Sequence, residues 1–243
     1  MQLLIIRHGD PDYIKDSLTE KGWKEAELLA DRLAALPIDA FYVSTKGRAR
    51  DTASLTLKKM AADSDEVDWL REMSHMIRRP DVPEERSIPW DWLPEDWTEV
   101  EDFFHPDRWY QSSVMEEGGV YEKYCQVTKA FDEVLEKHGY KRKGRIYQAV
   151  QPNRKILAFF CHFGLECVLL SHLMNVSPMI LWHHTCAAPT AVTSLYTEER
   201  RQGTAIFRMN CFGDVSHLYA AGEEPAFSAR FCETWDNPDE RHD

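Results

Sequence analysis

The sequence has neither an excess of positive charge nor a long apolar run, and each absence excludes a class of function. Asp and Glu number 41 against 29 Lys and Arg, so the formal net charge is −12 at pH 7. This balance argues against general binding to nucleic acids or anionic membranes, although a few arginines suffice for a small anion pocket. No apolar stretch is long enough to span a bilayer, and the apolar residues 1–6 are too few for a signal peptide. We expect neither a nucleic-acid partner nor a membrane partner.

The cysteine pattern of zinc sites and disulfide frameworks is also missing. The six cysteines include no Cys-x-x-Cys pair, so we interpret them as thiols in a reducing cytoplasm. His183, His184 and Cys186 come nearest to a metal cluster. Adjacent histidines rarely hold one ion well, and no acidic residue has helical spacing to them. We therefore expect a cytoplasmic protein without a metal or other cofactor.

Strands and helices are expected to alternate along the first seventy residues. The continuous apolar run at residues 3–6 is typical of a strand buried on both faces. The expected elements, in order, are strand 3–6, a helix from Thr19 to Leu36, strand 38–44, a helix opened by Gly47, and strand 67–70. This alternation predicts a parallel sheet with helices on its faces.

The second half of the chain continues the pattern after an interruption. Tryptophans, prolines and acidic residues without a clean period fill residues 74–117. Beyond them we expect a helix at 119–138, a solvated basic turn at 141–145, a strand at 156–161, a helix at 164–174, strands at 191–196 and 204–209, and an irregular tail after Gly213. The prediction is one α/β domain, 1–243, with helices on the faces of a mostly parallel sheet and an insertion over the core at about 74–153.

Side chains that can bind or transfer phosphate follow four of the predicted strands. The carboxyl ends of neighbouring parallel strands meet at one edge of a sheet, where ligands bind in α/β folds. These side chains should therefore converge at that edge. They are Arg7 and His8, Ser44 and Arg48, Arg71 and Glu72, and His162.

Each residue type suits one part of a phosphoryl transfer. The guanidinium groups of Arg7 and Arg48 can each bind two phosphate oxygens at once. A helix begins near Gly47, and the backbone N–H groups and the dipole at its N-terminus favour anions. The arginines should keep His8 neutral, and a neutral imidazole is a good nucleophile. His162 can donate to an equatorial oxygen in the transition state. A carboxylic acid is then needed to protonate the leaving oxygen.

In their order and contexts these residues resemble the histidine phosphatase superfamily, which includes the cofactor-dependent phosphoglycerate mutases. The resemblance covers roughly residues 1–73 and 154–210 and leaves out the insertion. It rests on five motifs: Arg7-His8-Gly9, Leu18-Thr19-x-x-Gly22, Ser44-x-x-x-Arg48-Ala49-x-x-Thr52-Ala53, Leu70-Arg71-Glu72 and Cys161-His162-Phe163-Gly164.

The resemblance implies a role for each matching residue. His8 would be the phosphorylated nucleophile, and Arg7, Arg48 and His162 would complete the phosphate pocket. Glu72 would be the proton donor. The family fold is a three-layer α/β/α sandwich whose insertions cap the site, and its mechanism uses no metal.

Three departures from the family pattern bear on the reaction. Only residues 10–17 separate the Arg-His-Gly turn from Leu18, whereas mutases carry a longer polar loop there. The Gly-x-x-x-Gly pattern after the donor glutamate is missing, and Phe163 stands where glycine usually follows the histidine. The insertion offers other acids in Asp81, Glu84 and Glu85.

We therefore expect a metal-independent phosphomonoesterase that acts on a small phosphorylated metabolite through a phosphohistidine. The alternatives are a phosphoglycerate-type mutase and a pseudo-enzyme that binds phosphorylated ligands. The oligomeric state is left open.

Overall fold

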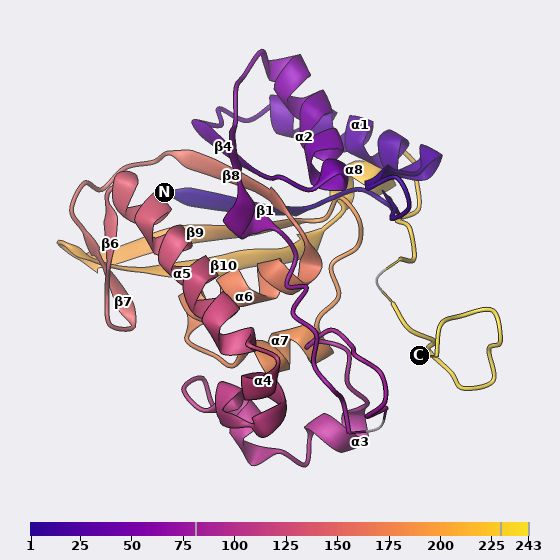
Figure 1. The fold of residues 1–243 in the computed structure, drawn as a ribbon. Coiled ribbons are helices and arrows are strands. Elements are labelled where there is room, and N and C mark those ends of the chain that lie inside the picture. Colours follow the sequence, from indigo (N-terminus) through magenta and orange to yellow (C-terminus); the bar gives the residue numbers. More distant parts are fainter. Residues whose placement is uncertain (81, 229, 243) are drawn as a thin grey trace.

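A mixed eight-stranded sheet forms the centre of the computed structural model, which describes residues 1–80, 82–228 and 230–242 (Figure 1). The strand order is β5-β4-β8-β1-β9-β10-β7-β6. The strands are β1 (Gln2–Arg7), β4 (Ala40–Ser44), β5 (Asp65–Val67), β6 (Tyr140–Lys143), β7 (Ile146–Ala149), β8 (Ile156–Cys161), β9 (Val192–Arg201) and β10 (Thr204–Asp214), and a separate hairpin joins β2 (Pro11–Asp12) to β3 (Ser17–Leu18).

Helices cover both faces of this sheet. One layer holds α1 (Glu20–Ala34), α2 (Gly47–Met60) and α8 (Ser216–Ala220), and the other holds α5 (Val120–Lys137), α6 (Phe163–Met174) and α7 (Pro178–His184) (Figure 1). The short helices α3 (Pro94–Trp97) and α4 (Ser113–Glu117) lie in a lobe beyond the second layer. The predicted three-layer α/β/α sandwich is confirmed.

Strand β1 shows why a continuous apolar run was the right signal. Leu3 and Ile5 belong to the core under α5 and α6, whereas Leu4 and Ile6 belong to the core under α1 and α2. Successive strand side chains point to opposite faces, so a strand covered on both sides needs apolar residues at every position. β1 pairs in parallel with β8, β8 with β4, and β4 with β5.

The other half of the sheet is antiparallel. β9 pairs with β1 and β10, and β7 pairs with β10 and β6, so the sheet is parallel only from β5 to β1. The expected solvated turn at 141–145 is only partly right, because residues 144 and 145 form an exposed turn whereas residues 141–143 belong to strand β6. The expected strand at 67–70 is also displaced: β5 ends at Val67, and Asp68–Leu70 is a 3-10 helix. The tail includes the short helix α8.

The tryptophan-rich segment packs as a lobe against α6 and α7. Trp97 is buried and stacks on His183, with ring centroids 4.9 Å apart. The Trp92 backbone N–H donates to His183 Nε2 at 3.3 Å. The second half of the segment 74–153 instead supplies α5 and two strands of the central sheet. Thus the cap-like part is the irregular portion before α5.

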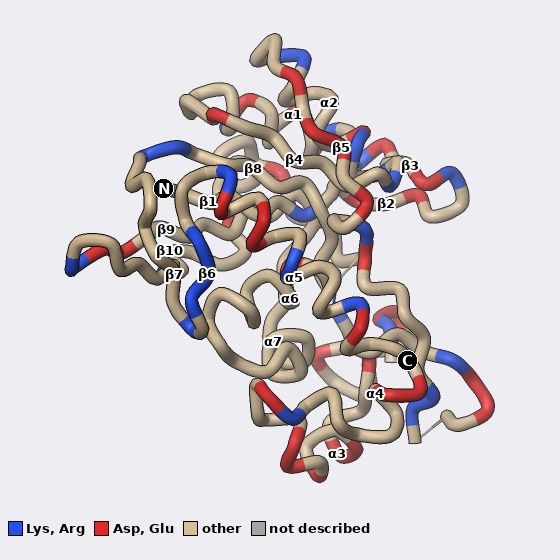
Figure 2. Tube along the Cα trace, turned by 60° about the vertical axis from the view of Figure 1, so that its left-hand side comes forward, with Lys and Arg blue, Asp and Glu red and all other residues tan. Residues whose placement is uncertain are grey.

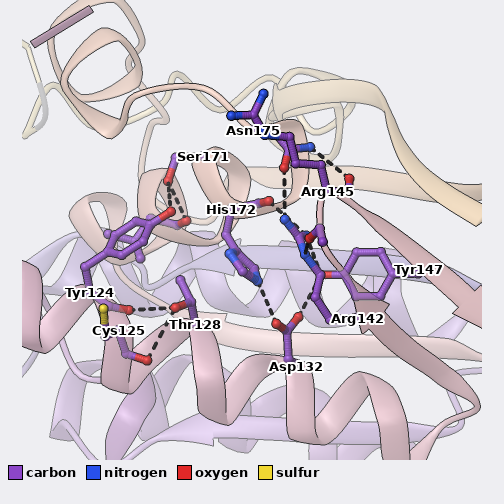
Figure 3. Close-up of polar contacts among 12 residues, drawn as sticks. Tyr124, Cys125, Thr128, Asp132, Arg142, Arg145, Tyr147, Ser171, His172 and Asn175 are labelled. Atoms are coloured by element: carbon purple, nitrogen blue, oxygen red, sulfur yellow. Dashed lines mark hydrogen bonds and ion pairs between the residues drawn. The ribbon is translucent and has the colours of Figure 1, made fainter. Parts of the chain in front are cut away.

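A polar network ties α5 and the β6–β7 hairpin to the C-terminal half of α6 (Figure 3). Asp132 accepts a hydrogen bond from Tyr147 Oη at 2.7 Å and contacts His172 Nε2 at 2.9 Å. Arg142 donates to the His172 carbonyl and to Asn175 Oδ1. The network fixes α6, and residues at the opposite end of that helix enter the candidate site.

Removing the carboxylate at the centre of this network should destabilise the fold. We expect Asp132→Ala to lower the free energy of unfolding by about 2 kcal/mol, because two partly buried partners lose their acceptor. The matched control is Glu136→Ala on the same helix, whose exposed ion pair with Lys141 should contribute less than about 1 kcal/mol. Urea denaturation of both variants measures the difference, and equal losses would contradict the assignment.

Charge is distributed in small groups over the surface. Figure 2 shows Lys and Arg alternating with Asp and Glu along the trace. None of the helices described here is long and apolar enough to cross a membrane. Any strong attraction for an anion must therefore come from a local cluster of cations, and the edge of the parallel strands supplies one.

Candidate active site

The parallel strand order brings the predicted site residues together. Arg7 ends β1, Ser44 ends β4 and His162 follows β8, and β8 lies between the other two strands. The His8 backbone N–H donates to the Cys161 carbonyl at 3.1 Å. The rings of His8 and His162 have centroids 5.1 Å apart. Convergence at the carboxyl edge of these strands is as expected.

The hydrogen bonds of His8 determine which nitrogen can attack. Its Nδ1 lies 2.7 Å from the Gly9 carbonyl oxygen, which can only accept, so Nδ1 carries the proton in the neutral ring. The lone pair therefore lies on Nε2, which accepts from Arg48 Nε at 3.2 Å. Burial, followed by the charges of Arg7 and Arg48, lowers the pKa of His8 well below 6.5. The ring is thus neutral at physiological pH, with a lone pair on Nε2.

Asp16, in the loop between β2 and β3, holds Arg48 in place. Arg48 Nη1 donates to Asp16 Oδ1 at 2.6 Å, and the Gly47 backbone N–H donates to Asp16 Oδ2 at 2.9 Å. The amide at the start of α2 thus binds an anionic group, which in this structure is the Asp16 carboxylate. The ring of Tyr13 lies 5.4 Å from the Arg48 guanidinium carbon. The short loop thus orients the cation by both charge and packing.

His162 has one nitrogen held and one available. Ser44 Oγ lies 2.9 Å from His162 Nε2 and accepts from the Lys46 backbone N–H. The hydroxyl has no other acceptor for its own proton among the hydrogen bonds of the described residues, so we assign that proton to the ring nitrogen. The remaining ring proton is then on Nδ1, which is buried and has no hydrogen-bond partner within the described chain. Burial, then neighbouring positive charge, lowers the pKa of His162 well below 6.5. A neutral ring with one open donor suits a phosphate oxygen.

Arg7 is buried beside the two histidines, with 4% of its surface exposed. Its Nη1 donates to the Ala187 carbonyl at 2.5 Å. Its Nε has no partner among the residues that the structure describes. A buried donor without a partner is costly, so the open Arg7 and His162 donors together indicate an anion site.

Gly22 explains why the motif at the start of α1 accompanies the turn that carries His8. A Cβ atom on Gly22 would lie 2.2 Å from the Asp10 carbonyl oxygen, so only glycine allows α1 to pack this closely on the turn after His8. Thr19 caps α1 by accepting from the Gly22 backbone N–H. Thr52 Oγ1 accepts from the Gly9 backbone N–H at 2.9 Å. Helices α1 and α2 therefore fix the turn from both sides.

Glu72, in the loop after the 3-10 helix Asp68–Leu70, lies against the first turn of α6. Its carboxylate accepts from the backbone N–H groups of Met73, Leu165 and Gly164 at 2.9, 2.9 and 3.3 Å. Burial nevertheless raises the pKa of Glu72, against the opposing effects of the Met73 amide and the Arg48 charge. A carboxyl group with a raised pKa is suited to act as an acid near neutral pH.

The Glu72 carboxyl group and the ring of Trp90 approach the same point of α6. A Cβ atom on Gly164 would lie 2.8 Å from Glu72 Oε1 and 2.9 Å from the Trp90 ring, so both groups approach the same backbone. Trp90 also contacts Phe163 edge to face, with centroids 6.5 Å apart. Phe163, which replaces the usual glycine of the family, thus joins the lobe to the site.

The other predicted donors and ligands stand apart from this cluster. Glu84 and Glu85 are exposed, and Asp81 lies outside the described residues. His183 Nδ1 contacts the Met179 carbonyl oxygen at 2.7 Å, and its other nitrogen accepts from the lobe. No group of three or more metal-ligating side chains occurs within residues 1–80, 82–228 and 230–242.

Two residues near the site were not anticipated from the sequence. Asp16 gave no signal, because its role depends on a loop that returns to α2. Glu166 did give one: it is the only acid on α6, a helix that is buried nearly all round. An acid four residues after His162 on such a helix is an informative exception.

Comparisons with known proteins agree with this geometry. The model of the histidine phosphatase superfamily, branch 1, matches residues 3–211. A probable phosphatase of Schizosaccharomyces pombe is 24% identical over 234 residues, which are 90% of this chain and 95% of the relative.

Solved structures with low sequence identity share the fold. A phosphoserine phosphatase of Entamoeba histolytica, in complex with 3-phosphoglyceric acid, aligns with a TM-score of 0.57 at 14% identity over 89% of this chain and 98% of its own. A putative alpha-ribazole-5'-P phosphatase of Escherichia coli gives 0.55 at 18% identity over 88% and 98%. The resemblance found in the motifs is thereby confirmed, and the chain belongs to branch 1 of the histidine phosphatase superfamily.

Proposed function

We propose that the chain is a metal-independent phosphomonoesterase that hydrolyses a small phosphorylated metabolite through a phosphohistidine. The observation that carries this proposal is the hydrogen bond from His8 Nδ1 to the Gly9 carbonyl oxygen, which leaves the Nε2 lone pair facing the arginine-lined pocket. Residues 1–243 are proposed to form one domain, with the insertion at about 74–153.

In the first step the phosphoryl group moves from the substrate to His8. The substrate phosphate takes up the open donors of Arg7 and His162, and Arg48 Nε turns from His8 to a phosphate oxygen. The Nε2 lone pair then attacks phosphorus, and the P–O bond to the leaving group breaks. Glu72 donates its proton to the leaving oxygen, which departs as an alcohol.

In the second step water releases the phosphate. The Glu72 carboxylate, now ionised, accepts a proton from a water molecule that attacks phosphorus. The P–N bond breaks and its electron pair returns to Nε2. Inorganic phosphate leaves, and His8 and Glu72 are restored to their starting protonation states.

The short β2–β3 loop favours hydrolysis over a mutase reaction. A mutase must retain and reorient its substrate over a phosphorylated enzyme, and residues 10–17 leave little chain for that purpose. The Asp16 carboxylate also lies against Arg48, where it repels a second anionic group. The phosphatase names of the S. pombe and E. histolytica proteins support the same reaction.

Phosphate release in the presence of EDTA tests the proposal. We expect a panel of phosphomonoesters to yield inorganic phosphate at rates that EDTA leaves unchanged and vanadate abolishes. Interconversion of 2- and 3-phosphoglycerate without release would instead indicate a mutase. Binding of phosphorylated ligands without turnover would indicate a pseudo-enzyme, and either of these results would overturn the proposal.

A further inference from the structure

Glu166 is a buried acid that the proposed reaction does not use. Only 1% of its surface is exposed, and both carboxyl oxygens are buried without a hydrogen-bond partner in the described residues. An ionised carboxylate in such surroundings is strongly destabilising unless a positive charge compensates it. Its retention in the apolar helix α6 therefore needs an explanation other than packing.

The groups that face Glu166 come from four strands or helices and one loop. Arg7 on β1 is the positive charge among them, and Glu72 in the loop after the 3-10 helix is the negative one. The Cys161 thiol on β8 and the Cys167 thiol on α6 are buried beside it. The Thr193 hydroxyl on β9 is near but outside hydrogen-bond geometry.

The charge of Arg7 therefore acts at two anion positions. Its open Nε belongs to the phosphate pocket, and its charge also acts on Glu166. When the pocket is empty, this charge favours ionised Glu166. When a dianion fills the pocket, the compensating charge is shared and the dianion repels the carboxylate, so the protonated acid is favoured.

We propose that Glu166 is a positioning residue that balances the charge of Arg7 in the empty pocket and takes up a proton when a phosphate dianion binds. The acid acts through Arg7 and contacts no substrate. Burial raises the pKa of Glu166 to about 7, so the group titrates where a modest change of field alters its charge. The inference rests on the proposed phosphate pocket.

Calorimetry of sulfate binding can test this inference separately from catalysis. Sulfate mimics the phosphate dianion and does not itself titrate near neutral pH. Repeating the titration in buffers of different ionisation enthalpy gives the number of protons bound per sulfate. We expect wild-type protein to take up about half a proton more at pH 7 than Glu166→Gln, because a group with a pKa near 7 is about half ionised there.

The affinity should show the same coupling. The sulfate Kd of wild-type protein should rise more steeply from pH 6 to pH 8 than that of Glu166→Gln, by up to about tenfold, which is the largest factor that one group with a pKa of about 7 can add over this interval. Glu25→Gln is the matched control, since Glu25 is a fully buried helical acid whose carboxylate accepts the Asp10 and Ala226 amides.

Each outcome decides one question. Failure of sulfate to bind would refute the phosphate pocket, whereas binding with identical proton uptake in wild type and Glu166→Gln would refute the role of Glu166 alone. An equal loss of sulfate-linked proton uptake in Glu166→Gln and Glu25→Gln would also overturn the role of Glu166. If Glu166→Gln fails to fold, infrared difference spectra of wild-type protein replace it: sulfate must increase the C=O band of a protonated carboxyl group, and an unchanged band contradicts the proposal.

Discussion

Replacing His8 with alanine should reduce phosphate release by at least about 10⁴-fold. The substitution removes the only atom positioned to form the P–N bond, and loss of a nucleophile typically costs this much or more. The open donors of Arg7 and His162 remain in the variant, so a phosphate ester should still bind. We expect sulfate to bind His8→Ala with a Kd within about tenfold of the wild-type value. Release of phosphate and calorimetry measure the two effects.

Trapping the intermediate strengthens this test. Wild-type protein quenched during turnover of a radiolabelled ester should carry an acid-labile, alkali-stable label, as a phosphohistidine does, and His8→Ala should carry none. The pKa of His8 is held well below 6.5, so the ring stays neutral as the pH falls from 7 to 6. The rate of phosphoryl transfer should therefore not decline over that interval. Wild-type rates in His8→Ala would refute the assignment.

The parallel half of the fold was predictable because its signals are local. A continuous apolar run within β1 and within β8 indicates burial on both faces, and Arg7 and His162 at the ends of these runs mark the site. The cap of α1 at Thr19 followed from the chemistry of its side chain. These features depend on residues close in sequence, so no knowledge of tertiary contacts was needed.

The remaining features depend on contacts between distant segments. Lys141 and Arg142 appear as a solvated turn in sequence, but Arg142 packs on Tyr147 and bonds to the end of α6. Asp16 is an ordinary loop acid until the loop returns to α2. Glu72 was expected to follow a strand directly. It is instead held by amides of α6, ninety residues away in the chain, which no local pattern encodes.

Glu72→Gln should lower kcat for alkyl phosphates by about 10²- to 10⁴-fold, the usual contribution of a general acid. The amide oxygen can still accept from the Met73 and Leu165 backbone N–H groups, as Glu72 Oε1 does, but the amide cannot supply an acidic proton. Because the pKa of Glu72 is raised, the wild-type acid persists toward neutral pH and is lost as the pH rises through that pKa. The alkaline decline of kcat should therefore be present in wild-type protein and absent in the variant.

The leaving group separates proton donation from every other role of Glu72. p-Nitrophenolate departs without protonation, so the first turnover of Glu72→Gln with p-nitrophenyl phosphate should stay within about tenfold of the wild-type rate. The second step still needs a base, so a burst of about one equivalent should precede a slow steady state. An alkyl phosphate should give no burst.

Two outcomes would contradict this role of Glu72. A purely structural role would slow both substrates equally, and a loss of activity in Glu84→Gln or Glu85→Gln instead would identify an acid of the lobe as the proton donor. The burst therefore distinguishes a missing proton from a disturbed pocket, because only the former depends on the chemistry of the departing oxygen.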